Sequence, residues 1–182
     1  MTPTYTLSPT LKRLCVFGQV LAVLLALFSV WVFFAQGVVE QSLDAYWQRL
    51  SQTAKDVVVY SDLKKYLLIM IATLSYFAPA FILCGAYLVF GAFRRGDPFR
   101  KETVRSVRFL GMTIIVYALS KIITYSLVFL VLTYDNPPGT KELSLAVNGH
   151  TLVTLMIGII ILAVGHILIQ ASKIAEENRQ FI

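Results

Sequence analysis

The stretch at residues 14–39, LCVFGQVLAVLLALFSVWVFFAQGVV, contains 26 residues and no charged side chain. An α-helix needs about 20 predominantly apolar residues to cross the hydrocarbon core of a bilayer. The apolar part of a secretory signal peptide is only about 7–15 residues long, so this stretch is too long to be one. We therefore expect a membrane-spanning helix at residues 14–39.

Three further stretches have the same apolar character and the length of a span. With the first they predict an all-α membrane protein, a four-helix transmembrane bundle built as a single domain over residues 1–182. Pro79 lies inside the second of the three and lacks a backbone N–H, which predicts a kink near Ser75 rather than a break. The three stretches are residues 66–93, 109–134 and 151–172.

The composition favours a membrane protein over a soluble one. Of the 182 residues, 57% are hydrophobic and 14% are charged, whereas about 25% of the residues of a soluble domain are charged. Disorder is excluded because 13% of the residues are aromatic. The net charge of +6 is then a weak argument for nucleic-acid binding, and we expect no direct nucleic-acid partner.

The distribution of lysine and arginine predicts the orientation of the chain, because cytoplasmic loops are enriched in both. The net charge is +2 before residue 14 and +4 over residues 94–108. It is 0 over residues 40–65 and −1 over residues 135–150. We therefore expect both termini and residues 94–108 in the cytoplasm. The other two loops are expected to form a small extracytoplasmic cap.

The first loop of this cap has the pattern of an amphipathic helix. Leu43, Trp47, Leu50, Ala54 and Val57 follow one another at spacings of four, three, four and three, which places them on one helix face. Two interpretations stay open. The helix folds back on the bilayer surface, or it binds a partner.

Two segments in the expected cap are rich in residues that favour strands. They are residues 57–60, VVVY, and residues 143–147, LSLAV, the second of which precedes the turn pair Asn148–Gly149. Because both segments lie on the same side of the membrane, a small sheet is an alternative to irregular loops.

Residues 94–108 predict a helix that continues into the third span. Asp97 can cap it, and Pro98 suits its first position, where a backbone N–H has no partner in any case. Basic side chains at positions 101, 105 and 108 share one face of this helix. Three interpretations of that face stay open. It anchors the helix by the positive-inside rule, it binds anionic lipid headgroups, or it docks an acidic partner. The basic residues considered for the site are Arg94, Arg95, Arg100, Lys101, Arg105 and Arg108.

Three short segments carry a family resemblance. They are Gly96-Asp97-Pro98-Phe99, the basic start of the third span from Arg105 to Leu110, and the ending Ala175-Glu176-Glu177-Asn178-Arg179-Gln180-Phe181-Ile182. The chain resembles a bacterial membrane-protein family known as domain of unknown function 2975, which has four predicted spans. The resemblance implies a multi-pass protein of the bacterial plasma (inner) membrane. It also implies a regulatory partner, since family members often sit beside small helix-turn-helix regulators. The family has no established catalytic residues, so the resemblance assigns none.

Polar residues inside the spans are candidates for an intramembrane site, because charges there are costly and rare. Lys121 lies about 18 Å along the third span from its cytoplasmic end, and His166 lies about 9 Å along the fourth. Their side chains lean toward the same level, because helical side chains point toward the helix N-terminus. Two interpretations stay open. In the first, these side chains form a hydrogen-bonded cluster in the bundle core. In the second, the Lys121 ammonium donates its hydrogen bonds to nearby hydroxyls and carbonyls, and His166 packs as a neutral side chain. The residues of this cluster are Gln19, Tyr87, Tyr117, Lys121, Tyr125 and His166.

The spans lack the residues that transport and catalysis usually need. They contain no aspartate or glutamate, which argues against a proton- or sodium-coupled carrier. Ser120 and Lys121 are the only adjacent serine–lysine pair, but neighbours on a helix face different directions, so we expect no enzyme. The two cysteines and two histidines have no ligand spacing, so we expect no metal, no cofactor and no disulfide.

Together these features predict a non-enzymatic integral membrane protein that acts through protein interactions, as a sensor, an anchor or a regulator. The alternatives are a lipid- or small-molecule-binding membrane protein and an immunity protein against a membrane-acting toxin. The expected partners are anionic lipid headgroups at the cytoplasmic face and a cytoplasmic regulatory protein. Gly158, Gly165 and Ala171 allow helices to approach closely, either within the chain or between the copies of a homo-oligomer.

Overall fold

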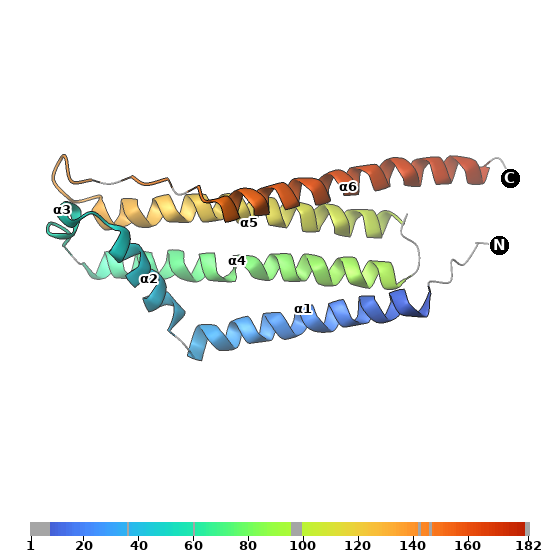
Figure 1. The fold of residues 1–182 in the computed structure, drawn as a ribbon, viewed down its shortest axis with the longest axis horizontal. Helices are drawn as coiled ribbons and strands as arrows, with labels where there is room; N and C mark the ends of the chain where they lie inside the picture. Colours follow the sequence, from blue (N-terminus) through green and yellow to red (C-terminus); the bar gives the residue numbers. More distant parts are fainter. Residues whose placement is uncertain are drawn as a thin grey trace. The chain divides into compact units, whose positions relative to one another are not determined.

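The chain is helical over most of the residues that the computed structural model describes. These residues are 8–35, 37–59, 61–95, 100–141, 143–145 and 147–180. Among them six helices follow one another and no strand occurs (Figure 1). The helices are α1 (Pro9–Ala35), α2 (Val38–Arg49), α3 (Gln52–Lys55), α4 (Asp62–Arg94), α5 (Lys101–Thr133) and α6 (Gly149–Gln180).

Four helices are long and apolar enough to cross a membrane, namely α1, α4, α5 and the part Gly149–Ile174 of α6. The predicted all-helical fold with four candidate membrane spans is therefore confirmed. The helices α4, α5 and α6 begin before the predicted spans, because hydropathy marks the apolar part of a helix and not its polar first turns. The start of α4 shows the reason, since the Ser61 hydroxyl accepts a hydrogen bond from the Lys64 N–H at 3.3 Å and satisfies a donor of the first turn. The cap predicted at Asp97 and Pro98 lies outside the described residues.

The first long helix ends earlier than its hydropathy predicts. The apolar stretch runs to residue 39, but α1 ends at Ala35 and α2 begins at Val38. Gly37 lies between them with a φ of 54°, a left-handed conformation that glycine adopts without steric cost. Residues 37–39 therefore do not belong to the first span.

The chain divides into two compact units, and each contains part of all four long helices. The starts of α1 and α5 and the ends of α4 and α6 fall in one unit, which we call the terminal unit. The helices α2 and α3 and the segment between α5 and α6 fall in the other, which we call the loop unit. The terminal unit comprises Met1–Phe28, Pro79–Val116 and Val153–Ile182, and the loop unit comprises Ser29–Ala78 and Tyr117–Leu152. The single domain over residues 1–182 stays a prediction.

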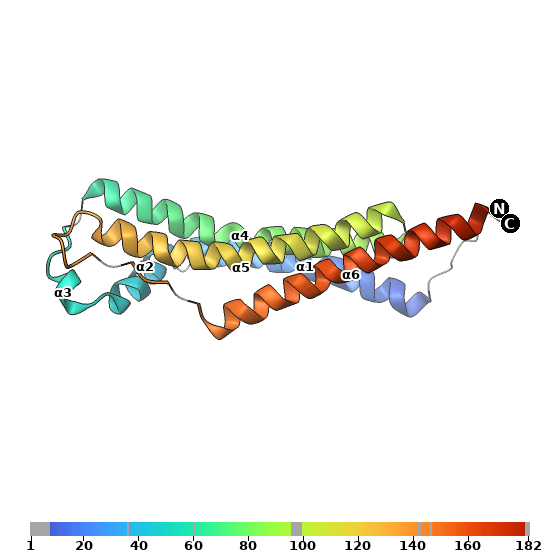
Figure 2. The same cartoon turned by 90° about the horizontal axis from the view of Figure 1, so that it is seen from above.

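In the terminal unit, glycines bring the backbones of α5 and α6 together (Figure 2). A Cβ atom at Gly111 of α5 would lie 2.7 Å from the backbone nitrogen of Leu162 in α6. A Cβ atom at Gly158 of α6 would lie 3.0 Å from the backbone nitrogen of Ile115. The Arg108 side chain packs against Gly165, because an added Cβ there would lie 2.7 Å from the Arg108 Cγ atom. Gly158 and Gly165 of α6 thus serve packing within the chain.

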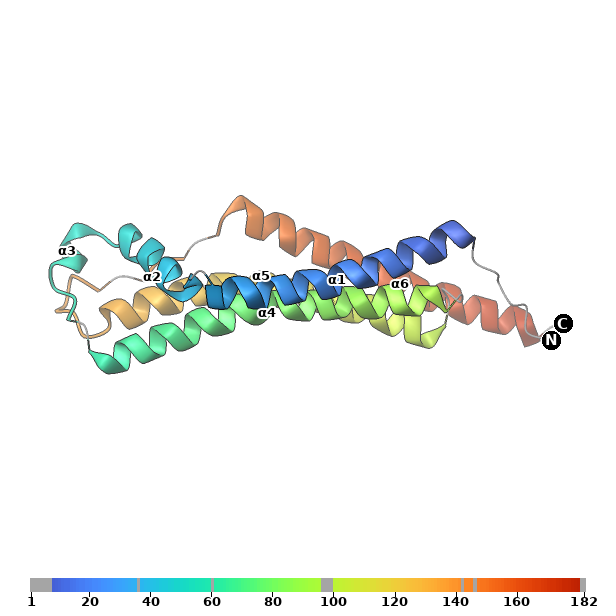
Figure 3. The same ribbon diagram turned by 90° about the horizontal axis from the view of Figure 1, so that it is seen from below.

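In the loop unit, α2 and α3 pack against the start of α4 and the end of α5 (Figure 3). The pattern that predicted one amphipathic helix corresponds to α2 and α3, which are separated at Leu50 and Ser51. Ser51 ends the interruption, because its hydroxyl accepts a hydrogen bond from the Ala54 N–H at 3.2 Å. The apolar side chains of α2 pack against a core within the chain. That core consists of Leu50, Ala54, Leu68, Val128, Phe129 and Leu132, with Leu43, Tyr46 and Trp47 packed against it.

The small sheet considered for residues 57–60 and 143–147 is not formed by their described residues, which contain no strand. The segment after α5 runs back beside α5 instead (Figure 1). The Ser126 hydroxyl of α5 donates a hydrogen bond to the Ser144 carbonyl at 3.1 Å. This backbone acceptor is therefore satisfied by a helix side chain rather than by a second strand. Residues 60, 142 and 146 lie outside the described residues.

Candidate functional site

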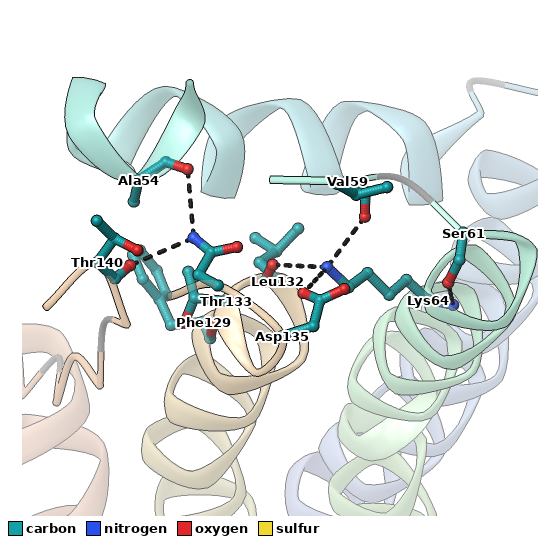
Figure 4. A network of polar contacts seen from close by, with 10 residues as sticks. Ala54, Val59, Ser61, Lys64, Phe129, Leu132, Thr133, Asp135 and Thr140 are labelled. Carbon is teal, nitrogen blue, oxygen red and sulfur yellow. Dashed lines mark hydrogen bonds and ion pairs between the residues drawn. The ribbon is translucent and has the colours of Figure 1, made fainter. Parts of the chain in front are cut away.

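A set of hydrogen bonds around Lys64 joins the start of α4 to the end of α5 in the loop unit (Figure 4). The Lys64 side chain is 0% exposed, and an ammonium group has three donor hydrogens and no acceptor. Its Nζ donates to the Val59 carbonyl at 3.0 Å, to the Leu132 carbonyl at 3.2 Å and to Oδ1 of Asp135. The three acceptors match the three donor hydrogens. We call these residues the Lys64 network.

The Lys64 network also satisfies the end of α5. The last carbonyls of an α-helix have no intrahelical donor, and the C-terminal end of a helix attracts positive charge. Leu132 lies in the last turn of α5, which ends at Thr133. The Lys64 ammonium therefore supplies both a donor and a positive charge at this helix end.

Asp135 balances the charge of the buried ammonium. Its side chain is 37% exposed. The hydrogen bond from Lys64 holds the pKa of Asp135 below its ordinary value of 3.8, although desolvation acts in the opposite direction. The carboxylate is therefore ionised at neutral pH, so the ammonium is not left as an uncompensated buried charge.

The next residue, Asn136, extends these contacts to α3. Its side chain amide donates to the Ala54 carbonyl at 3.4 Å and to the Thr140 carbonyl at 3.3 Å (Figure 4). Asn136 is 3% exposed. The contacts of Lys64 and Asn136 thus hold α3, the start of α4 and the turn after α5 in one arrangement, which is a structural role.

The basic face predicted at the start of α5 is present in the terminal unit. Lys101, Arg105 and Arg108 are exposed, whereas the neighbouring Val104 and Val107 are buried. None of the three basic residues forms an ion pair with another described residue. Within the described part of the chain, this face therefore carries positive charge that no ion pair balances.

The other three predicted basic residues surround the same loop. Arg94 and Arg95 are exposed at the end of α4. The Arg100 Nε lies 2.8 Å from a Glu102 carboxylate oxygen, and both side chains are 56% exposed. A pair so exposed contributes little to stability, so Arg100 is partly neutralised without being held in a packed site.

The intramembrane Lys121 has polar and aromatic neighbours in the loop unit. Its Nζ lies 3.3 Å from the Ser75 hydroxyl and 5.3 Å from the centre of the Tyr117 ring. The side chain is half-buried. The carbonyl of Ser75 has no helical donor because Pro79 lacks an N–H, yet α4 continues through Pro79 without a break. These neighbours are of the kind expected if Lys121 is satisfied by nearby hydroxyls.

Gln19 contacts the backbone of Tyr87 in the terminal unit. The Gln19 side chain amide donates to the Tyr87 carbonyl, not to its hydroxyl, at 3.4 Å. Gly91 makes room for this contact, since an added Cβ would lie 2.9 Å from Gln19 Nε2. The bond links α1 to α4.

The remaining two predicted cluster residues have other surroundings. Tyr125 of the loop unit stacks on Phe129 with ring centres 4.9 Å apart and lies 5.7 Å from the ring of Tyr46. His166 of the terminal unit is exposed. The structure thus pairs Gln19 with Tyr87 and Lys121 with Tyr117, and the six-residue cluster as a whole stays a prediction.

The described part of the chain holds no group of three or more histidine, cysteine or acidic side chains that could bind a metal. Cys15 is buried, Cys84 is exposed, and both are free thiols.

The Lys64 network was not predicted from the sequence. Lys64 and Lys65 are adjacent and carry the same charge, so composition and spacing do not distinguish the buried one from the exposed one. A weaker signal was available. Consecutive spans are usually neighbours in space, so a lysine before the second span and an aspartate after the third are expected near each other.

The four long apolar helices define a multi-pass membrane protein. A family model described as protein of unknown function DUF2975 matches residues 3–182. The chain belongs to this family, so the resemblance seen in the short motifs is confirmed over the whole chain. No curated protein and no solved structure matches the chain.

Proposed function

We propose that the chain is a non-enzymatic membrane protein that acts through protein interactions, as a sensor, an anchor or a regulator. The proposed contact surface is the basic face formed by Lys101, Arg105 and Arg108. The observation that supports it is the exposure of all three side chains without an ion pair among the described residues. An acidic protein surface is complementary to such a face, and complementary charge favours encounter and register.

The proposed orientation places this face, both termini and the loop between α4 and α5 in the cytoplasm of a bacterial plasma membrane. Two observations support it. The net charge of +4 over residues 94–108 exceeds that of either loop on the opposite side. The start of α1, the end of α6 and the α4–α5 ends also belong to one compact unit.

Site-specific photo-crosslinking in native membranes tests the proposed contact. A photoreactive amino acid replaces Lys101, and the matched control replaces Lys141, an exposed lysine between α5 and α6. We expect a protein adduct from position 101 and none from position 141. Adding Arg105→Glu reduces the yield of the protein adduct from position 101 by about fivefold or more, because the new carboxylate repels the acidic surface of the partner. Adducts with lipid alone, or a protein adduct that Arg105→Glu leaves unchanged, overturn the proposal.

A further inference from the structure

A groove of about 570 Å³ lies between α1 and α4 within the terminal unit. Its volume is in the range of ligand-binding clefts. Cys15 and Ala22 of α1 and Ala86 of α4 line the groove with short side chains, whereas Gly18 makes room for the Phe90 ring, which an added Cβ would meet at 2.6 Å. The bond from Gln19 to the Tyr87 carbonyl holds the two helices together beside it. Every residue that lines the groove is apolar.

The groove has the length of a lipid acyl chain in one leaflet. On α1 it is lined from Leu11 to Leu25, which corresponds to about 21 Å of helix, and on α4 from Leu83 to Phe93, which corresponds to about 15 Å. One leaflet contributes about 15 Å to the hydrocarbon core. The groove therefore runs from the membrane boundary, where α1 begins and α4 ends, toward the middle of the bilayer.

Four basic residues adjoin the boundary end of the groove. Lys12 and Arg13 follow Leu11 on α1, Arg94 follows Phe93 as the last residue of α4, and Arg95 is the next residue of the chain. All four are exposed, and none forms an ion pair with a described residue. A negatively charged group at this level would be attracted by both helices, whereas the apolar lining below accepts only hydrocarbon.

We infer that the groove binds an anionic phospholipid, with one acyl chain along α1 and α4 and the phosphate headgroup beside Lys12, Arg13, Arg94 and Arg95. The same charges disfavour a second copy of the chain as the occupant. Copies inserted in one orientation carry these four residues at the same membrane boundary, so docking along the groove brings like charges together. An anionic lipid joins the opposite charge to the apolar chain. The site is distinct from the basic face of α5.

Lipid retention in native mass spectrometry tests this inference. The full chain is incubated with phosphatidylglycerol or phosphatidylcholine that carry the same acyl chains. We expect retention of phosphatidylglycerol to exceed that of phosphatidylcholine. The double variant Arg94→Gln/Arg95→Gln lowers this preference by about fivefold for each arginine removed. Lys141→Gln, which removes an exposed lysine that does not line the groove, leaves the preference unchanged.

Ala86→Phe fills the groove without changing any charge and is expected to abolish the retention of phosphatidylglycerol. Equal retention of both lipids by the unmodified chain overturns the inference, and so does full retention of phosphatidylglycerol by Ala86→Phe.

A second measurement does not depend on the folding of Ala86→Phe. A photoreactive amino acid at Leu21, which lines the groove, is compared with one at Val20, which does not. The two native residues are similarly exposed, at 42% and 50%. In nanodiscs of mixed lipids, adducts from position 21 are enriched in phosphatidylglycerol over the bulk ratio, and adducts from position 20 follow that ratio. Identical adduct ratios at both positions contradict the inference.

Discussion

Lys64 and Lys121 both hold an ammonium group away from bulk water, and their partners differ. Lys64 is fully buried and donates to two carbonyls and a carboxylate. Lys121 is half-buried, and its described polar partner is one hydroxyl. Because a buried charge stabilises a fold only when its partners compensate for desolvation, the same substitution has different effects on stability at the two positions.

Lys64→Met lowers the stability of the protein in detergent. The Val59 and Leu132 carbonyls lose their donor, and Asp135 loses its counter-charge, which together cost about 2 kcal/mol. Thermal unfolding monitored by circular dichroism measures the change. Lys65→Met is the matched control, because Lys65 is exposed, and it leaves the midpoint unchanged. Equal midpoints for the two variants would show that the Lys64 network is not stabilising.

Lys121→Met leaves the unfolding midpoint unchanged or raises it. Methionine keeps most of the volume and removes a charge that is costly inside the membrane. The same thermal unfolding experiment measures the midpoint, and Lys64→Met, which lowers the midpoint, is the comparison. A loss of stability as large as that of Lys64→Met would instead support a compensated polar cluster around Lys121.

The Asp135 carboxylate makes the stability depend on pH. Its pKa is held below 3.8 in the folded chain by the hydrogen bond from Lys64. A carboxyl with a depressed pKa contributes stability that is fully present above its unfolded pKa and is lost as the pH falls through the folded pKa. The unfolding midpoint of the unmodified chain should therefore exceed that of Asp135→Asn at neutral pH, and the difference should shrink below pH 3.8. If the difference between the two midpoints does not shrink below pH 3.8, the hydrogen bond from Lys64 is not the source of this stability.

The single residues also show where prediction from sequence ends. The scarcity of charge inside the spans singled out Lys121, whereas the adjacent lysines 64 and 65 gave no hint of their different burial. Lys64 and Asp135 are 71 positions apart. Their meeting depends on the packing of α4 against α5, which a one-dimensional pattern does not contain.

At the scale of helices, the contact of α5 with α6 depends on the absence of side chains. An added Cβ at Gly111 meets backbone atoms of Leu162 at 2.7 and 3.0 Å, so one of the two helices has to move. Gly111→Ala should therefore cost about 1–3 kcal/mol of stability. Gly149→Ala is the control at the start of α6, where an added Cβ meets nothing within 4 Å. Thermal unfolding of both variants measures the difference, and equal midpoints would mean that the close contact does not form.

The helices were the most predictable elements, and their ends and connections the least. Apolar runs of about 20 residues leave few alternatives in a membrane, so all four spans were found. The end of α1 was missed because the apolar run continues through Gly37, whose φ of 54° is not that of a helix. The described strand-prone residues after α5 contain no strand, and a hydroxyl of α5 satisfies the Ser144 carbonyl. The sequence pattern does not contain this contact between distant positions.

At the scale of the whole molecule, the charge distribution and the division into two units lead to a testable topology. In a variant without Cys15 and Cys84, a new cysteine at position 141 should react in intact cells with a maleimide that does not cross membranes. One at position 101 should react only after permeabilisation. Both positions are exposed, so a difference reports the side of the membrane and not burial.

Labelling of position 101 in intact cells, and of position 141 only after permeabilisation, would separate the proposed protein contact from the proposed lipid site. A basic face on the outer side is not available to a cytoplasmic partner, so the proposed function would fail. The groove between α1 and α4 would keep its apolar lining and its four basic neighbours, because these depend on the helices and not on the direction of insertion. Its anionic lipid would then come from the outer leaflet. The lipid preference measured in detergent would be unchanged, while crosslinking from position 101 would yield no cytoplasmic protein.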